Sequence, residues 1–231
     1  MGILQLIPQK SFFVKPEEPF SPGQFCWVPV PHIDPIPRIL DIERDSPEEH
    51  TEVSFKLRNA NKKKDFRVKD RVLPIKYLNL RAHEELLVQR AKKRPAIILS
   101  TNVECFPDIA KILKTKGKKH LQEDAMFVVP CYSIEKGNSR AGFPAEMVTR
   151  IRCLIYRQFF YYPASTELHE GVARFDRVQT VIGKDPATIE PVNLALSDEA
   201  YSVFLSVFLY CMSGDKDDDL ESTKELLAEL I

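Results

Sequence analysis

The chain has 231 residues, of which 44% are apolar and 29% charged, with 33 basic and 33 acidic side chains. This composition supplies enough apolar surface for a globular core and excludes an intrinsically disordered chain. The longest apolar runs, such as residues 126–129, are far shorter than the roughly 20 residues that a membrane-spanning helix needs.

The first residues and the cysteines indicate the compartment. The N-terminal stretch lacks the basic start and the small-residue cleavage site of a signal peptide, so we expect a cytoplasmic protein without a membrane partner. The five cysteines are odd in number and widely spaced, which is typical of reduced core thiols. No Cys-x-x-Cys or paired-histidine spacing indicates a metal, and we expect no cofactor.

Charge is sorted along the chain. Residues 16–54 contain nine acidic and two basic side chains, residues 56–94 contain four acidic and fourteen basic ones, and residues 185–231 contain eleven acidic and two basic ones. This asymmetry is typical of a molecule with a cationic face for a polyanion. An alternative is that the three blocks interleave in the fold and neutralise one another.

The first third of the chain is predicted to be extended. Seven prolines between Pro16 and Pro37 exclude a mainly helical segment, and residues 23–28 carry the aromatic and β-branched side chains of a strand. Alternating polarity over residues 37–43 and 51–58 predicts a hairpin. Lys62, Lys63 and Lys64 are expected at the tip of a second turn, before a further alternation at Phe66 and Val68, and a solvated loop is the alternative for the lysines.

Residues 92–100 are the stretch around which the chain is organised. Lys92, Lys93 and Arg94 are predicted to form a basic loop. Pro95 is predicted to begin a buried strand that ends at Ser100. Arg94 is therefore expected at the mouth of a strand, where a guanidinium can clamp a phosphate with two parallel hydrogen bonds. A solvated arginine at the edge of a sheet is the alternative.

The following elements are predicted from the same patterns. We predict short helices at residues 83–90 and 107–119. We predict a strand at 125–134, a loop at 137–142, two strands within 147–162 and the last strand at 171–181. Ser197 is a predicted N-cap for an apolar helix to Met212, and Ser222 with Glu225 forms a capping box for a second helix. The order of elements predicts one α+β domain, mainly β, built on a small barrel.

Four blocks of sequence resemble the PemK/MazF family of toxin endoribonucleases, which share a small SH3-like barrel with the CcdB toxins. These are GQFCWVPV (23–30, with Gln24 where the family often has aspartate), QRAKKRPAIILS (89–100), FVVPCYS (127–133) and RFDRVQTV (174–181). The resemblance covers roughly residues 21–30 and 88–213. It implies a single SH3-like domain over residues 1–231, with an insertion at about 31–87 and a C-terminal helical segment at about 197–231.

The resemblance implies cleavage of single-stranded RNA without a metal, with the neighbouring 2′-hydroxyl as nucleophile. Arg94 would stabilise the charge on the phosphate and Ser133 would donate its hydroxyl to a phosphate oxygen, while RNA would contact Lys92, Lys93, Tyr132 and Arg140. Because arginine stays protonated, the 2′-hydroxyl needs a separate general base. His169 and His83 are the candidates, since they are the histidines nearest in sequence to the blocks that resemble the family. Tyr162 is a second candidate for stacking on a base, and core packing is the favoured alternative for residues 159–162 as a group.

The partners implied are single-stranded RNA, an antitoxin protein and a second copy of the chain. We expect a homodimer because the helix over residues 198–212 is apolar on nearly all sides. A competing interpretation is a non-catalytic module that binds a protein or nucleic acid, as CcdB does. A third is a regulatory partner that docks through the acidic tail and the apolar helix.

Overall fold

The computed structural model describes residues 2–44, 53–68, 80, 83–101, 125–135 and 142–229. The helix predicted at 107–119, nearly all of the loop at 137–142, and Arg140 lie outside the described residues. The chain divides into two compact units, which are described separately here. Unit 1 comprises Met1–Pro29 with Lys93–Ile231, and unit 2 comprises Val30–Lys92.

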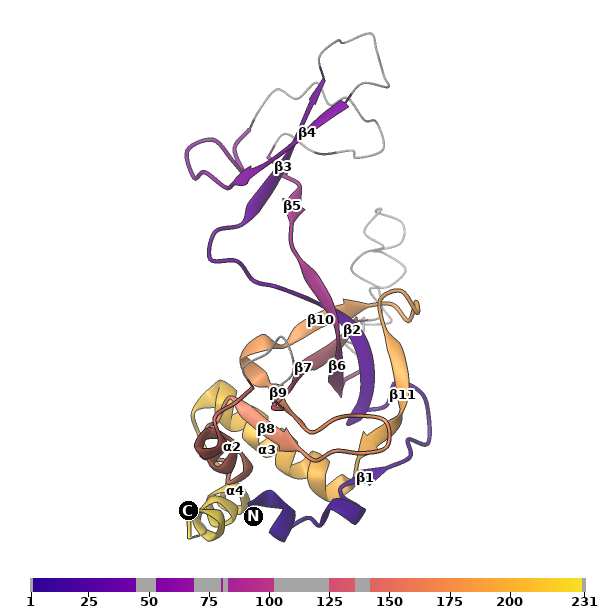
Figure 1. The fold of residues 1–231 in the computed structure, drawn as a ribbon, viewed down its shortest axis with the longest axis vertical. Helices are drawn as coiled ribbons and strands as arrows, with labels where there is room; N and C mark the ends of the chain where they lie inside the picture. The colour runs from indigo at the N-terminus through magenta and orange to yellow at the C-terminus, as the bar shows by residue number, and fades with distance from the viewer. Residues whose placement is uncertain are drawn as a thin grey trace, which may run out of the picture. The chain divides into compact units, whose positions relative to one another are not determined.

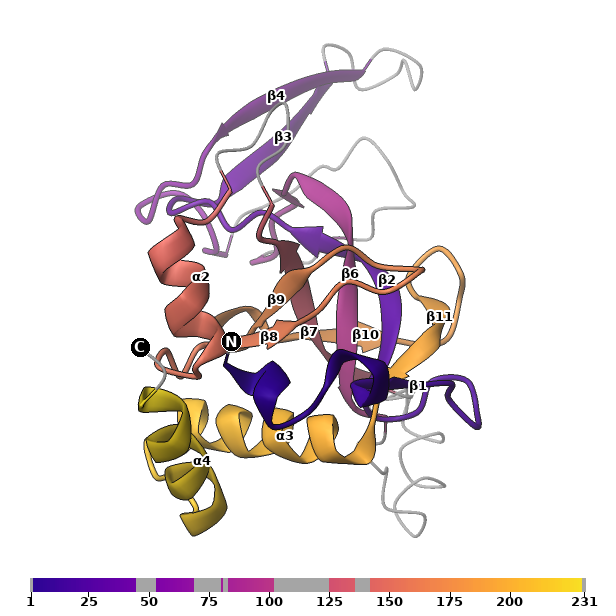
Figure 2. The same ribbon diagram turned by 60° about the horizontal axis from the view of Figure 1, so that its bottom comes forward.

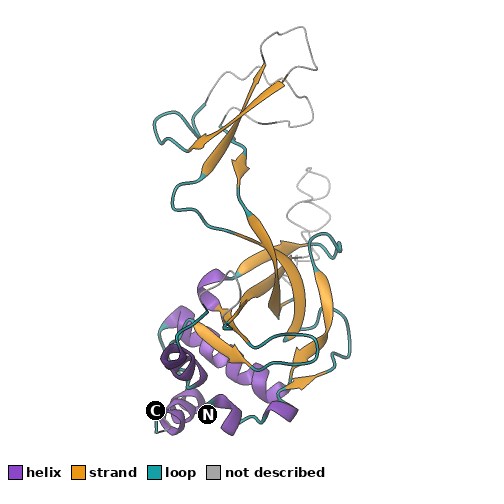
Figure 3. Ribbon diagram, in the orientation of Figure 1, coloured by secondary structure: helices purple, strands orange, loops and turns teal. Residues whose placement is uncertain are grey.

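Unit 1 is built on an antiparallel sheet (Figures 1 and 3). Its strands follow the order β1-β11-β2-β6-β7-β9-β8, and β10 pairs with β7. This path ends at β1 on one side and β8 on the other, so the described strands do not close into the small barrel that the sequence predicts. The strands are β1 (Phe13–Val14), β2 (Gln24–Pro31), β6 (Ala91–Ser100), β7 (Ala125–Ser133), β8 (Phe159–Tyr162), β9 (Gly171–Arg174), β10 (Gln179–Ile182) and β11 (Glu190–Leu196).

Helices cover one end of this sheet, where both chain termini also lie (Figures 1 and 2). The buried ring of Phe204 on α3 contacts the rings of Phe160 and Phe175, with centroids 5.3 and 5.1 Å away. Ser197 caps α3 as predicted, its hydroxyl accepting the Ala200 N–H at 3.3 Å. The α-helices of the described residues are α2 (Ala145–Arg152), α3 (Asp198–Ser213) and α4 (Asp218–Ala228), with single 3-10 turns η1 (Ile3–Gln5), η2 (Gln9–Ser11) and η5 (Phe175–Arg177).

The fold is therefore α+β and mainly β, which confirms the predicted class. In the described part of the chain, no helix has the length and apolar character needed to cross a membrane.

Unit 2 contains a three-stranded antiparallel sheet in the order β4-β3-β5. The pairing of β3 (Arg38–Arg44) with β4 (Val53–Asn59) confirms the predicted hairpin, and β5 (Leu87–Val88) adds to the other edge of β3. On one face Arg58 lies between two carboxylates, contacting Asp41 and donating two hydrogen bonds to Asp65 at 2.7 and 2.6 Å. Asp65 is only 4% exposed, so this ion-pair network fixes the turn that follows β4.

Two predicted elements are wrong because tertiary contacts override the local pattern. Residues 83–90 contain β5 rather than a helix, since Leu87 and Val88 pair with β3. The first half of 147–162 is helix α2 rather than a strand. Its Met147, Val148 and Ile151 lie at helical spacing and pack on the core, and Glu146 and Arg150 form an i,i+4 ion pair at 2.7 Å.

Other boundaries differ from the prediction. Residues 91–94 belong to strand β6, so Arg94 lies inside a strand rather than in a loop at its mouth. The predicted strand at 171–181 is broken by η5, and β11 follows it as a strand that was not predicted. Phe66 and Val68 lie in no strand. Helix α4 begins four residues before Ser222, because the Asp217 carboxylate accepts the Leu220 N–H at 2.7 Å.

Candidate nucleic-acid interface

Strands β6 and β7 bring Arg94 to Tyr132. Their register pairs Ala96 with Pro130 and Ile97 with Val129, and its continuation places Arg94 opposite Tyr132. The Arg94 Cζ lies 4.4 Å from the centroid of the Tyr132 ring, within the range of a cation–π contact. Both side chains are partly buried, and Arg94 forms no ion pair with any described residue. The guanidinium of Arg94 is thus held in place by stacking on Tyr132, and its positive charge is not neutralised by a carboxylate.

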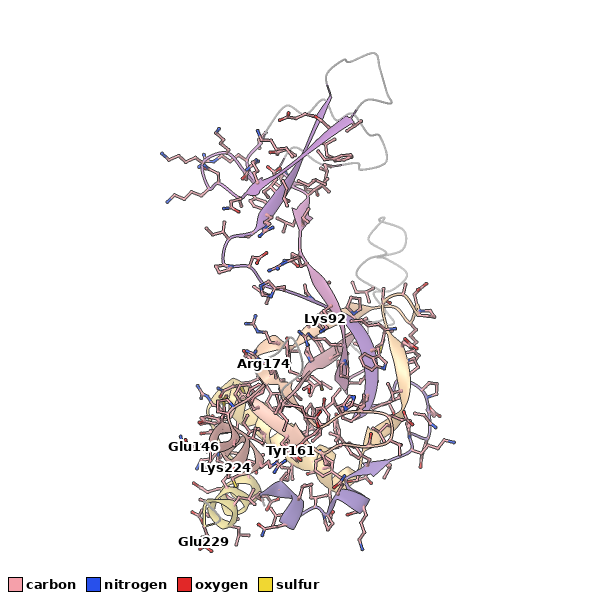
Figure 4. All side chains as sticks on the ribbon, viewed as in Figure 1. Lys92, Glu146, Tyr161, Arg174, Lys224 and Glu229 are labelled. Atoms are coloured by element: carbon pink, nitrogen blue, oxygen red, sulfur yellow. The ribbon has the colours of Figure 1, made fainter. Side chains whose placement is uncertain are left out.

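A second arginine reaches the same ring from the opposite neighbour of β7. Arg174 ends β9, which lies on the other side of β7 from β6. Its Cζ is 5.2 Å from the centroid of the Tyr132 ring and 5.8 Å from that of Phe159. In Figure 4 the labelled Arg174 lies among the strands of unit 1, whereas Glu229 lies at the helical end. Tyr132 therefore joins two guanidinium groups from different strands.

Asp176 orients Arg174. The Nε and Nη2 of Arg174 donate to the two oxygens of Asp176 at 3.0 and 2.5 Å, and Arg177 Nε lies 3.6 Å from the same carboxylate. Burial alone would raise the pKa of the Asp176 carboxyl. The hydrogen bond from Arg174 and the charges of both arginines outweigh burial and lower this pKa below its usual value. Asp176 is therefore ionised at neutral pH.

We call Arg94, Tyr132, Arg174, Asp176 and Arg177 the arginine–tyrosine cluster. Three guanidinium charges face one carboxylate, so the cluster carries a net positive charge. Guanidinium groups match the oxygens of a phosphate in pairs, and their planes can stack on bases. The cluster thus combines cations, which attract phosphates, with planar groups on which bases can stack.

The structure separates Ser133 and Lys93 from Arg94 and Tyr132. Ser133 follows Tyr132 in β7, and because side chains alternate along a strand its hydroxyl lies on the opposite face from the Tyr132 ring. That hydroxyl accepts the Glu135 N–H at 3.3 Å. Lys93 forms an ion pair with Glu190, and Lys92 is exposed and belongs to unit 2. The structure thus brings Tyr132 to Arg94 and shows no contact between Ser133 and Arg94.

The ion pairs also bear on the sorting of charge along the sequence. Lys93 with Glu190 joins the basic block to the C-terminal acidic block, and Arg58 with Asp41 joins it to the first acidic block. The blocks therefore interleave at these two points, while the arginine–tyrosine cluster stays cationic.

The structure also describes the two candidate bases and the second candidate for stacking. His169 is 88% exposed at its side chain, with Nδ1 3.9 Å from Glu135 Oε2, and the exposed His83 lies in unit 2. In the described part of unit 1, no histidine forms a hydrogen bond, ion pair or ring contact with a residue of the cluster. Tyr162 is only 1% exposed and packs edge-on against Phe25, so the favoured alternative, core packing, is confirmed and stacking on a base is excluded.

Sequence reasoning missed Arg174, Asp176 and Arg177. The signal was present as Arg-Phe-Asp-Arg, two arginines flanking a carboxylate within four residues. The pattern over residues 171–181 predicts one regular strand, in which successive side chains point to opposite faces. The 3-10 turn η5 instead lets both arginines reach Asp176.

Comparison of the chain with models of known protein families, with curated proteins and with solved structures gives no match. Across the described ranges, no three His, Cys, Asp or Glu side chains are grouped so that they could hold a metal ion.

Proposed function

We propose that the protein is an endoribonuclease of the PemK/MazF type that cuts single-stranded RNA without a metal, by attack of the neighbouring 2′-hydroxyl at the arginine–tyrosine cluster. One observation carries the proposal. Two arginines from different strands stack on Tyr132, and Arg94 among them has no carboxylate partner in the described residues. A cation held rigidly and left without a counterion favours an anionic ligand.

The arrangement of the strands supports an SH3-like relationship. The four blocks that resemble the family fall on β2, β6, β7 and the β9–β10 segment. These strands are neighbours in the sheet, in the order β2-β6-β7-β9, with β10 also on β7. Segments far apart in the sequence that carry the resemblance are thus assembled around one place, as a shared site requires.

In this proposal the arginines stabilise the negative charge that develops on the phosphate during cleavage. Negative charge grows on the phosphate oxygens as the 2′-oxygen attacks, and Arg94 and Arg174 donate hydrogen bonds to those oxygens. Asp176 holds Arg174 in position through its two hydrogen bonds. Its lowered pKa makes Asp176 a weak base, so we assign it positioning rather than proton transfer.

The test is cleavage of a long single-stranded RNA by the full chain in the presence of a chelator. We expect fragments with 5′-hydroxyl ends, and a loss of about 10²- to 10³-fold in rate for Arg94→Ala or Arg174→Ala. Arg150→Ala is the matched control, because Arg150 pairs with Glu146 on α2 and should leave the rate unchanged. Cleavage that needs a divalent metal, or that survives both substitutions, contradicts the proposal.

The role of Ser133 stays a prediction that the same assay decides. If its hydroxyl contacts the phosphate, Ser133→Ala slows cleavage while binding of uncleavable RNA persists. A rate equal to that of the wild type removes Ser133 from the site and leaves the two arginines as the proposed phosphate ligands.

A second candidate function is binding of single-stranded nucleic acid without cleavage. The observation that favours it is that no described histidine of unit 1 forms a hydrogen bond, ion pair or ring contact with the cluster, so the cluster lacks a histidine to accept the proton of a 2′-hydroxyl. This function predicts that RNA stays intact with the wild-type protein while Arg94→Ala weakens binding.

Two protein partners complete the proposal. An antitoxin follows from the resemblance to the toxin family. A second copy of the chain follows from α3, where Leu209 and Met212 lie at helical spacing and are 57% and 56% exposed. Apolar side chains on one side of a buried helix are typical of a surface that a partner covers.

A further inference from the structure

The turn after β4 in unit 2 presents three consecutive lysines on a fixed backbone. The Asn61 carbonyl accepts the N–H groups of Lys64 and Asp65 at 3.0 and 2.9 Å, and the Asn61 side chain accepts the Lys63 N–H at 2.9 Å. The Asp65 carboxylate accepts the Asn61 N–H at 2.6 Å and is held from the other side by Arg58. The turn is therefore anchored to the sheet through a buried carboxylate.

The three lysines of this turn keep their charge available. Lys62, Lys63 and Lys64 are exposed, and none of them forms an ion pair with a described residue. The one acidic side chain of the turn, Asp65, is engaged by Arg58. A rigid group of three ammonium charges without counterions attracts a polyanion.

An aromatic side chain follows the lysines in an unfavourable backbone conformation. Phe66 has φ of 55°, a left-handed conformation that costs free energy for a bulky residue, and its side chain is 53% exposed. Its N–H donates to Glu85 Oε1 at 3.3 Å. The chain thus holds a large apolar ring in solvent beside the lysines, where burial does not compensate for the strain.

We propose that residues 61–68 form a second binding surface for single-stranded RNA, in which Lys62, Lys63 and Lys64 contact successive phosphates and Phe66 stacks on a base. This combination is what single-stranded nucleic acid requires, because its phosphates are regularly spaced and its bases expose their faces. The choice of RNA rests on the proposed function, but the surface shares no residue with the arginine–tyrosine cluster and needs no cleavage to be detected.

The experiment measures binding of the full chain to a 2′-O-methyl RNA of about 20 nucleotides, which 2′-hydroxyl attack cannot cut. Each phosphate contact on a single strand adds about 0.7 to the slope of log affinity against log salt. Replacing Lys62, Lys63 and Lys64 by alanine should therefore lower that slope by about 2 and weaken binding about a hundredfold at 0.1 M salt. Phe66→Ala should weaken binding about five- to a hundredfold with the slope unchanged, and Phe66→Trp should retain binding.

The control removes the same charge elsewhere. Lys10, Lys15 and Lys184 are exposed lysines of unit 1, and their joint replacement by alanine should leave the affinity and the salt slope close to those of the wild type. Equal losses in this control and in the Lys62, Lys63, Lys64 variant overturn the proposal, because they would show attraction by net charge alone. The proposal is also overturned if vesicles of anionic lipid, or polyglutamate, bind as tightly as RNA does and lose that binding in the Lys62, Lys63, Lys64 variant.

Failure of this inference differs from failure of the proposed function. If the wild type does not cut RNA but the turn variants lose binding, the second surface stands and the nuclease assignment falls. If the wild type cuts RNA and the turn variants bind as it does, the nuclease assignment stands and the second surface is refuted.

Discussion

Phe204→Ala tests how α3 is attached to the sheet. Phe204 is fully buried, with its ring 5.3 Å from that of Phe160, 5.1 Å from that of Phe175 and 5.9 Å from that of Tyr201. Removal of a buried phenylalanine ring costs about 3–5 kcal/mol, and the lost aromatic contacts favour the upper half of that range. With a urea m-value of about 2 kcal/mol/M, a loss of about 4 kcal/mol lowers the midpoint of unfolding by about 2 M.

The assay is urea unfolding of the full chain, monitored by the fluorescence of Trp27. Trp27 is the single tryptophan of the chain and packs against the core of unit 1, so its fluorescence reports the unfolding of that unit. Ser202→Ala is the matched control on the same helix, because Ser202 is exposed and its replacement should change stability by at most about 0.5 kcal/mol. If Phe204→Ala lowers the midpoint no more than Ser202→Ala does, α3 is not held to the sheet by this aromatic contact.

Three further predictions concern the cap, the cluster and the assembly. Ser197→Ala should cost about 1 kcal/mol by removing the cap of α3, and an unchanged urea midpoint would exclude that cap. Because the pKa of Asp176 is lower in the folded protein, its contribution to stability is present at neutral pH and is lost as the pH falls through that lowered pKa. The difference in urea midpoint between wild type and Asp176→Asn should therefore shrink on acidification below about pH 4, and a constant difference would contradict the ion pair. Leu209→Asp should convert the proposed homodimer into a monomer in sedimentation experiments, whereas a wild-type monomer at micromolar concentration removes the dimer.

The strands with the strongest local patterns were predictable from sequence. The segment 24–31 has aromatic and β-branched residues after a glycine, and the 38–44 and 53–59 hairpin alternates apolar and charged side chains. In both cases the local pattern and the tertiary pairing agree. Ser197 was predictable for the same reason, since an N-cap is a local hydrogen bond.

Residues whose pattern fits two structures were not predictable. Ile151 and Cys153 alternate as in a strand, but Met147, Val148 and Ile151 also lie at helical spacing, and packing on the core selects the helix. Leu87 and Val88 form a strand because β3 offers an edge, which no local pattern reveals. Tertiary contacts decide both cases.

The candidate site was predictable in part. Arg94 and Tyr132 were each selected from sequence, but their stacking depends on the register between β6 and β7, which sequence alone does not fix. Arg174 joins them because β9 pairs with the far edge of β7, a consequence of topology. The alternation of side chains along β7 places the Ser133 hydroxyl on the other face from the Tyr132 ring, and the role of Ser133 stays a prediction.

The most direct test of the central claim is the rate at which the Arg94→Ala protein cuts single-stranded RNA in a chelator, relative to the wild type and to Arg150→Ala. Stabilisation of phosphate charge by the guanidinium stacked on Tyr132 predicts a loss of about 10²- to 10³-fold for Arg94→Ala and none for Arg150→Ala. A wild-type protein that leaves RNA intact, or an Arg94→Ala protein that cuts it at the wild-type rate, contradicts the account.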